Sequence, residues 1–187
     1  AAERVFEFLD EEEEDQTVEH PADIRNIQGN VEARHVAFGY QPDHLIIHDF
    51  SGYVKAGQKV AIVGPTGAGK TTMIKLLMRF YDVNSGEILI DGHNVKEFNR
   101  SQLRELFGMV LQDTWLFHGT IMENIRYGRL DATDEEIREA ARQVSADTVA
   151  EKLEKGYDSD VGESGGRLST GEKQLISFAR AILANPR

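Results

Sequence analysis

The pattern of hydrophobic positions divides the chain into a β-rich region and a mainly helical one. Residues 31–63 carry short runs rich in strand-forming residues that Gly, Asp and Pro interrupt, which predicts antiparallel strands. The run 59–63 (KVAIV) is apolar and β-branched and ends at Gly64, a pattern typical of a central strand that is covered on both faces. Two further strands are predicted, at residues 87–92 and 108–112.

Helical spacing of apolar residues predicts a helix directly after the glycines that follow the run 59–63. Four apolar residues of the stretch 71–81 recur at i, i+4, i+7 and i+8 and therefore share one helix face: Met73, Leu77, Phe80 and Tyr81. Thr133 and Glu136 have the spacing of a capping box, which favours another helix start. The other predicted helical stretches are residues 5–9, 101–107, 120–125, 133–144, 147–153 and 172–183.

Composition and charge narrow the possible functions. The 187 residues are 40% hydrophobic, enough for the core of one ordinary domain. The net charge is −11, and residues 1–34 hold 3 basic against 11 acidic side chains, so a nucleic-acid partner is disfavoured. The six consecutive carboxylates at 10–15 repel one another and predict an extended, solvated linker. Cysteine is absent, which excludes disulfides, and apolar stretches of about five residues are too short to span or insert into a bilayer.

A glycine-rich loop carries the strongest chemical signal. Residues 64–71 (GPTGAGKT) satisfy G-x-x-x-x-G-K-[ST] between a predicted strand and a predicted helix. Gly67 and Gly69 let backbone N–H groups point inward, and the helix N-terminus adds partial positive charge, so the loop suits a polyanion. Lys70 offers a cation to the β- and γ-phosphates of ATP, and the Thr71 hydroxyl suits Mg²⁺. The alternative is a glycine-rich turn with a solvated lysine. The predicted nucleotide contacts are Gly64, Thr66, Gly67, Ala68, Gly69, Lys70, Thr71 and Thr72.

Many protein families use such a phosphate-binding loop, and a second motif indicates which of them this chain resembles. Residues 168–172 (LSTGE) precede a helix and resemble the signature of the ATP-binding cassette (ABC) family, whose usual form is LSGGQ. Ser169 and Glu172 also form a capping box, which is a complete structural explanation of both residues. Three more features are similar to exporter cassettes: a Q-loop that starts at Gln112, an X-loop at Gly162–Gly165 with Ser164 where Arg is common, and an aromatic, Tyr40, in position to stack on adenine.

The resemblance implies an α/β fold, namely a P-loop NTPase ABC cassette with an N-terminal antiparallel β subdomain and a helical subdomain, incomplete at its C-terminus. The expected parts are an acidic linker from a transmembrane domain at 1–28, the β subdomain and P-loop core at 29–111, the Q-loop and helical subdomain at 112–170, and the signature helix at 171–187. The family places the Walker B strand, its Asp and the catalytic Glu after a segment like that at the end of this chain. We therefore expect the 187-residue fragment alone to be inactive as an ATPase.

The resemblance also implies roles for individual residues. Lys70 and Gln112 would take part in catalysis, and Thr71 and Gln112 would hold Mg²⁺. Ser169 and Gly171 would face the γ-phosphate of an ATP that is bound to a second cassette. Trp115, the one tryptophan, is interpreted as a packing or interface residue.

The implied function is that of the ATP-binding domain of an ABC exporter, which couples ATP binding and hydrolysis at a cassette dimer interface to substrate transport. Its partners would be a second cassette, in a homo- or heterodimer, and the transmembrane domain of the same transporter, at the cytoplasmic face of the cell membrane. The alternative is a non-transport ABC-type ATPase that acts as a conformational clamp on chromosomes or ribosomes. Chromosome-type relatives would carry long heptad insertions, which this chain lacks, and a GTPase is disfavoured because no NKxD motif is present.

Overall fold

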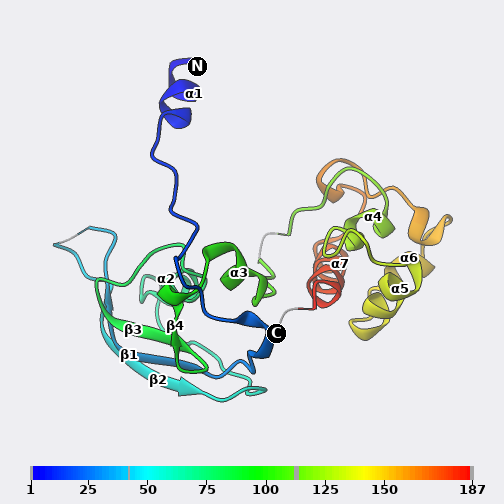
Figure 1. Ribbon diagram of the computed structural model, residues 1–187. Helices are drawn as coiled ribbons and strands as arrows, with labels where there is room; N and C mark the ends of the chain where they lie inside the picture. The colour runs from blue at the N-terminus through cyan, green and yellow to red at the C-terminus, as the bar shows by residue number, and fades with distance from the viewer. Residues whose placement is uncertain (1, 42, 112–113, 186–187) are drawn as a thin grey trace. The chain divides into compact units, whose positions relative to one another are not determined.

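The computed structural model describes residues 2–41, 43–111 and 114–185, and these form two compact units. The first unit comprises Ala1–Glu105 and the second comprises Leu106–Arg187 (Figure 1). No helix among the described residues is long and apolar enough to cross a membrane. Each unit has its own buried side chains and is described separately.

A four-stranded antiparallel sheet is the centre of the first unit. The strands lie in the order β2-β1-β3-β4, and Val31 in β1 lies opposite Val54 in β2 and Ile90 in β3. Val36 and Ile88 are fully buried, whereas β2 is an edge strand with mostly exposed residues. The elements in chain order are α1 (Ala2–Leu9), η1 (Ile24–Asn26), β1 (Val31–Phe38), β2 (Ile47–Val54), α2 (Lys70–Leu77), β3 (Ser85–Ile90), β4 (His93–Asn94), η2 (Val95–Glu97) and α3 (Arg100–Glu105).

The predictions of strands at 59–63 and 108–112 are wrong for the part of each run that the structure describes. Residues 59–63 form no strand, and Val60 and Val63 are 58% and 86% exposed. Residues 108–111 are likewise irregular. An apolar, β-branched run has the composition of a strand, but the hydrogen bonds of a strand come from its neighbours. No described strand pairs with either run.

The helix α2 ends earlier than its apolar pattern predicts. It covers Lys70–Leu77, so residues 80–81 lie beyond it. Arg79 has φ +51°, a left-handed conformation that stops a helix. The Arg79 side chain donates to the Phe98 carbonyl at 3.1 Å and pairs with Asp82 at 3.0 Å. These contacts fix the turn that follows α2.

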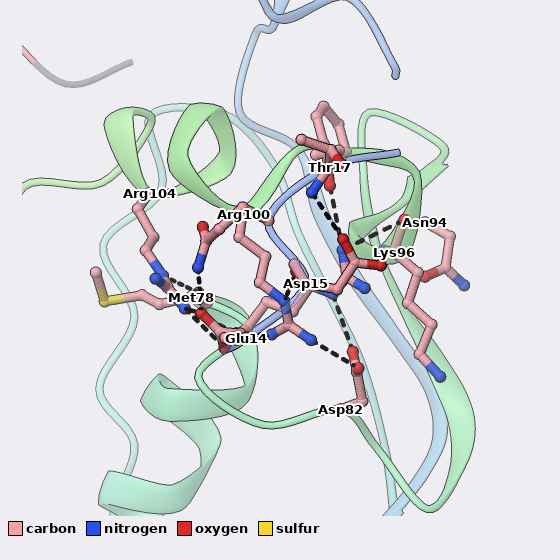
Figure 2. A network of polar contacts seen from close by, with 12 residues as sticks. Glu14, Asp15, Thr17, Met78, Asp82, Asn94, Lys96, Arg100 and Arg104 are labelled. Atoms are coloured by element: carbon pink, nitrogen blue, oxygen red, sulfur yellow. Dashed lines mark hydrogen bonds and ion pairs between the residues drawn. The ribbon is translucent and has the colours of Figure 1, made fainter. Parts of the chain in front are cut away.

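Two arginines of α3 anchor the acidic N-terminal segment (Figure 2). Arg100 and Arg104 pair with the Glu14 carboxylate at 3.0 and 3.1 Å, and Arg100 Nε donates to the Asp15 carbonyl at 2.9 Å. The prediction of an extended, solvated linker at 10–15 holds for the irregular backbone and for the exposure of these residues. It did not include the ion pairs of Glu14 with Arg100 and Arg104. Local like-charge repulsion does not prevent this contact, because the opposite charges come from α3.

The same two arginines cover the carbonyl groups at the end of α2. Arg100 donates to the Arg79 carbonyl at 2.6 Å, and Arg104 donates to the carbonyls of Arg79 and Met78 at 3.2 and 3.4 Å. The last carbonyls of a helix lack intrahelical partners, and a guanidinium has enough N–H donors to serve several of them at once. The N-terminal segment, α2 and α3 are thereby joined through two side chains.

The described residues of the second unit form the helices α4 (Ile121–Arg126), α5 (Asp134–Gln143), α6 (Asp147–Glu151) and α7 (Thr170–Leu183), with η3 (Gly156–Asp158) and η4 (Glu163–Gly165) between α6 and α7. The predicted capping box of Thr133 and Glu136 is confirmed at the start of α5. The helices bury one apolar cluster, which includes Ile121, Ile125, Ile137, Ala141, Val149, Ile176 and Ala179.

A partly buried set of hydrogen bonds holds the turn between β3 and β4 to the segment ahead of β1. Asp91 and Gly92 have φ of +48° and +84°, as a tight hairpin turn requires. The Asp91 carboxylate accepts from the backbone N–H groups of Gln28, Gly29 and Asn30 and from the Asn30 side chain. Burial alone would raise the pKa of Asp91, but these hydrogen bonds together hold it below its ordinary value.

We expect Asp91 to make the stability of the first unit sensitive to acid. Because its folded pKa lies below the unfolded value of about 3.9, the carboxylate stabilises the fold above that pH, and this contribution is lost as the pH falls through the lowered pKa. Asp91→Asn should lower the free energy of unfolding at neutral pH and flatten its decline in acid. Urea unfolding over a series of pH values measures both effects. Asp131→Asn, at a 90% exposed side chain, is the control, and equal flattening in both variants would contradict the assignment.

Candidate functional site

The glycine-rich loop 64–69 leads directly into α2. Gly67 and Gly69 have φ of +84° and +83°, a left-handed backbone that glycine adopts without strain. A Cβ on Gly69 would also lie 3.1 Å from Ile46 Cγ2 and 3.2 Å from Ile47 Cγ1. A Cβ on Gly67 would meet no other atom within 4 Å, so the loop is open at this position.

The N-terminus of α2 offers backbone donors to an anion. Gly69 is the N-cap residue and provides no side-chain oxygen to accept from the first turn. The first N–H groups of a helix have no intrahelical acceptor, and the helix dipole places partial positive charge there. The end of α2 therefore suits a phosphate group, as the sequence predicts.

Lys70 lies at this end of α2 and is folded over the loop. Its ammonium donates to the carbonyls of Gly64 and Pro65, each at 2.7 Å. An ammonium has three donors, so these two bonds leave capacity for a phosphate oxygen. Thr71 is exposed beside it, whereas Thr72 is only 6% exposed. The loop residues Gly64, Thr66, Gly67 and Ala68 are all exposed.

Tyr40 is brought next to this loop by α2. Its hydroxyl and the Thr72 hydroxyl lie 3.3 Å apart, which places the ring beside the first turn of the helix. The residue is 46% exposed, so a planar base has access to it. Of the predicted contacts, the first unit thus collects Tyr40 and the residues from Gly64 to Thr72. The buried Thr72 contributes a link to Tyr40 that the sequence did not predict.

The predicted signature residues lie at the start of α7, in the second unit. The Ser169 hydroxyl accepts from the Glu172 N–H at 3.3 Å, while the Glu172 carboxylate accepts from the Ser169 N–H at 2.9 Å, which confirms the capping box. The Ser169 N–H and hydroxyl hold the pKa of Glu172 below its ordinary value. Gly171 is exposed, and a Cβ on it would meet open space, so its backbone is accessible.

The segment ahead of the signature is held in a strained turn. Ser164 has φ +50°, and its carbonyl accepts from Lys173 Nζ at 3.0 Å. A Cβ on Gly165 would lie 3.1 Å from both Leu116 and Lys173, so only glycine fits there without a shift. Gln112, which is predicted to reach Mg²⁺, lies outside the described residues.

Asn124 is a functional candidate that sequence analysis missed. It is 1% exposed, accepts from the Phe117 N–H at 2.9 Å and donates to the Phe117 carbonyl at 3.0 Å. Arg180 of α7 donates to Asn124 Oδ1 and to its carbonyl, at 3.1 and 2.9 Å. The T-x-x-E spacing of Thr120 and Glu123 signals the start of α4, but no local pattern in the sequence marks Asn124.

Beside Asn124, three aromatic side chains form a surface, here called the aromatic surface: Trp115, Phe117 and Tyr127. The rings of Trp115 and Phe117 lie 4.4 Å apart at 78°, and Phe117 lies 4.4 Å from Tyr127. Trp115 and Tyr127 are 55% and 56% exposed, and the Arg180 guanidinium lies over the rings of Phe117 and Tyr127. Burial lowers the pKa of Arg180. The interpretation of Trp115 as a packing or interface residue stays a prediction.

Comparisons with known proteins identify the family. The profile described as ABC transporter matches residues 47–187. The chain is 53% identical over 187 residues to a fatty acid ABC transporter ATP-binding/permease protein of Mycobacterium tuberculosis, which covers 100% of this chain and 29% of that protein. It is 49% identical over 158 residues to a mitochondrial iron-sulfur clusters transporter of Aspergillus fumigatus. That match covers 84% of this chain and 22% of that protein.

The fold of the chain is also similar to that of a solved ABC exporter structure. The structure of a bacterial Atm1-family ABC exporter with ATP bound superposes with a TM-score of 0.88 at 42% sequence identity. The match covers 99% of this chain and 33% of that chain. The chain thus spans about a third or less of the length of these relatives. The predicted cassette fold and the resemblance to exporters are confirmed.

We expect Ser169→Ala to destabilise α7. Loss of the N-cap acceptor should lower the free energy of unfolding by about 1 kcal/mol, because an N–H of the first turn loses its partner. Ser169→Asn should retain most of the stability, since Asn caps helices well. Urea unfolding of both variants measures the difference. Equal stability of Ser169→Ala and the parent chain would contradict the capping role.

Proposed function

The chain belongs to the ABC transporter family, and we propose that it is the ATP-binding domain of an exporter. In this proposal, ATP binding and hydrolysis at the interface of two cassettes drive substrate transport across a membrane. The observation that carries it is the open loop 64–69 with the uncapped end of α2 and the Lys70 ammonium beside it. The transporter names of the two relatives and the similarity to an exporter structure favour transport over the alternative of a clamp on chromosomes or ribosomes.

The triphosphate of ATP would bind at the N-terminus of α2. The N–H groups of the loop would donate to the phosphate oxygens, and Lys70 would exchange its carbonyl partners for the β- and γ-phosphates. Thr71 and Gln112 would hold Mg²⁺, which neutralises phosphate charge when it is bound. The exposed Thr71 hydroxyl beside the loop supports this assignment. Lys70 and Gln112 would act on the reacting phosphate, but neither is a base that could activate water.

A second cassette, identical or different, would complete the site. We propose that Ser169 and the backbone N–H of Gly171 face the γ-phosphate bound by the partner cassette. Their position at the exposed first turn of α7 supports this, because that helix end also carries partial positive charge. Glu172 is engaged in the capping box, and its carboxylate accepts from the Ser169 N–H and hydroxyl. The Ser169 hydroxyl would exchange this partner for the phosphate.

The transmembrane domain of the transporter would be the other partner. Trp115, Phe117 and Tyr127 form the aromatic surface, and Asn124 holds the backbone of Phe117. Exposed aromatic residues such as Trp115 and Tyr127 commonly anchor protein interfaces. We propose that this surface receives the membrane domain, with the cassette at the cytoplasmic face of the cell membrane. The acidic composition argues against nucleic acid, and the membrane contact would be made through protein and not by lipid insertion.

Lys70→Ala in the complete transporter should weaken ATP binding by about 10- to 100-fold, because a charge-assisted contact to the phosphates is lost. Displacement of a fluorescent ATP analogue measures the affinity. Lys59→Ala, which removes an exposed ammonium ahead of the loop, is the matched control and should bind normally. Unchanged affinity in a folded Lys70→Ala protein would exclude the loop as the phosphate site.

Gln112→Ala should impair transport more than nucleotide binding. In the proposed role, Gln112 joins the Mg²⁺ site to the segment that carries Trp115 and Phe117. ATP affinity and substrate-stimulated ATP turnover of the reconstituted transporter, measured on the same variant, separate the two effects. Gln143→Ala, at the end of α5, is a control of the same side chain. Equal proportional losses of binding and turnover in Gln112→Ala would argue against a coupling role.

A further inference from the structure

Tyr81 belongs to no motif of the nucleotide site, yet its ring contacts the proposed base-stacking residue. The ring centroids of Tyr81 and Tyr40 lie 5.0 Å apart at 81°, and Tyr81 also lies 5.7 Å from Phe38. Phe38 and Tyr40 are themselves 5.1 Å apart at 84°. Near-perpendicular packing at these distances is a favourable aromatic geometry. Tyr40 is thus held by two rings and by its bond to Thr72.

The backbone on both sides of this ring cluster is tied together by Asn84. Its side-chain oxygen accepts from the Gly39 N–H at 2.9 Å, and its own N–H donates to the Ala37 carbonyl at 3.0 Å. Gly39 immediately precedes Tyr40, and Asn84 lies three residues after Tyr81. The two tyrosines therefore stand on segments whose separation is fixed by hydrogen bonds.

The turn that carries Tyr81 is itself rigid. Arg79 reverses the chain with its positive φ and pairs with Asp82, and Asp82 pairs with Arg100 at 3.1 Å, as Figure 2 shows for that part of the network. The side chain of Arg100 is only 11% exposed. A turn held at both ends gives Tyr81 a fixed position against Tyr40.

Lys75, a half-buried residue of α2, adds a contact to both rings. Its ammonium lies 5.6 Å from the Tyr40 centroid and 5.9 Å from the Tyr81 centroid. A cation at this distance is attracted to the face of an aromatic ring. The orientation of Tyr40 is therefore set by neighbours on three segments: the end of β1, the helix α2 and the turn after it.

We propose that Tyr81 is a positioning residue for the purine base of the bound nucleotide, because it fixes the angle of the Tyr40 ring. This inference rests on the proposed function, in which Tyr40 stacks on adenine. Tyr81 itself touches no phosphate-binding residue through a described contact. Its removal should therefore weaken recognition of the base and leave recognition of the triphosphate unchanged.

Two ligands separate these effects in the complete transporter: ATP, and ribose 5′-triphosphate, which lacks the base. Tyr81→Ala should weaken ATP binding about two- to tenfold, the range of an aromatic pair, and leave ribose 5′-triphosphate binding unchanged. Tyr81→Phe keeps the ring and should bind ATP normally. Tyr53→Ala, at another exposed tyrosine of the first unit, is the control that should change neither affinity. Calorimetry measures both ligands.

A double variant tests whether Tyr81 acts through Tyr40. Tyr40→Ala/Tyr81→Ala should bind ATP no more weakly than Tyr40→Ala alone, because the stacking ring is already gone. Additive losses, equal losses of both ligands in Tyr81→Ala, or unchanged ATP binding in Tyr81→Ala would each overturn the proposal. Lys70→Ala separates a failure of the proposed function from a failure of the Tyr81 proposal. If Lys70→Ala keeps full affinity for both ligands, the assignment of the loop as the phosphate site is wrong, independently of the results for Tyr81.

Discussion

The polar groups at the two ends of α2 need partners that the helix cannot supply, and the arrangement of the first unit follows from how each end meets this need. At the C-terminal end, Arg100 and Arg104 donate to the carbonyls that follow the helix and bind Glu14. At the N-terminal end, Gly69 offers no capping side chain, so the N–H groups remain available to an anion. One end is fixed and the other is open, which suits a helix that binds phosphate.

The turn after α2 extends this fixed end toward the base. Its left-handed Arg79 stops the helix, and the contacts of Asp82 hold the turn against α3. Tyr81, on the same turn, packs against Tyr40, whose hydroxyl reaches Thr72 in the first turn of α2. The contacts to phosphate and to base would therefore both be positioned by α2 and the segments at its two ends. A change in the turn after α2 would affect binding of the base more than binding of the phosphates.

Satisfaction of buried polar groups also organises the second unit. Asn124 is almost fully buried and pairs with both backbone groups of Phe117, while Arg180 brings α7 to the same side chain. Trp115 remains exposed and packs against Phe117, whose backbone these hydrogen bonds hold. At the start of α7, Ser169 and Glu172 satisfy each other, so the cap that stabilises the helix also holds an acidic side chain at its N-terminal end.

Sequence alone determined the features that depend on residues a few positions apart. The loop 64–71, the capping boxes at Thr133 and Ser169 and the antiparallel strands that begin at Val31 could be predicted, because their geometry is encoded in local spacing and residue type. The family could be predicted for the same reason. Tertiary structure decided the rest. The run 59–63 has the composition of a strand but no partner among the described residues, Glu14 is held by arginines far along the chain, and Asn124 is buried without a local signal. Hydrogen bonds and ion pairs between distant segments exist only once the chain has brought those segments together, so no local pattern specifies them.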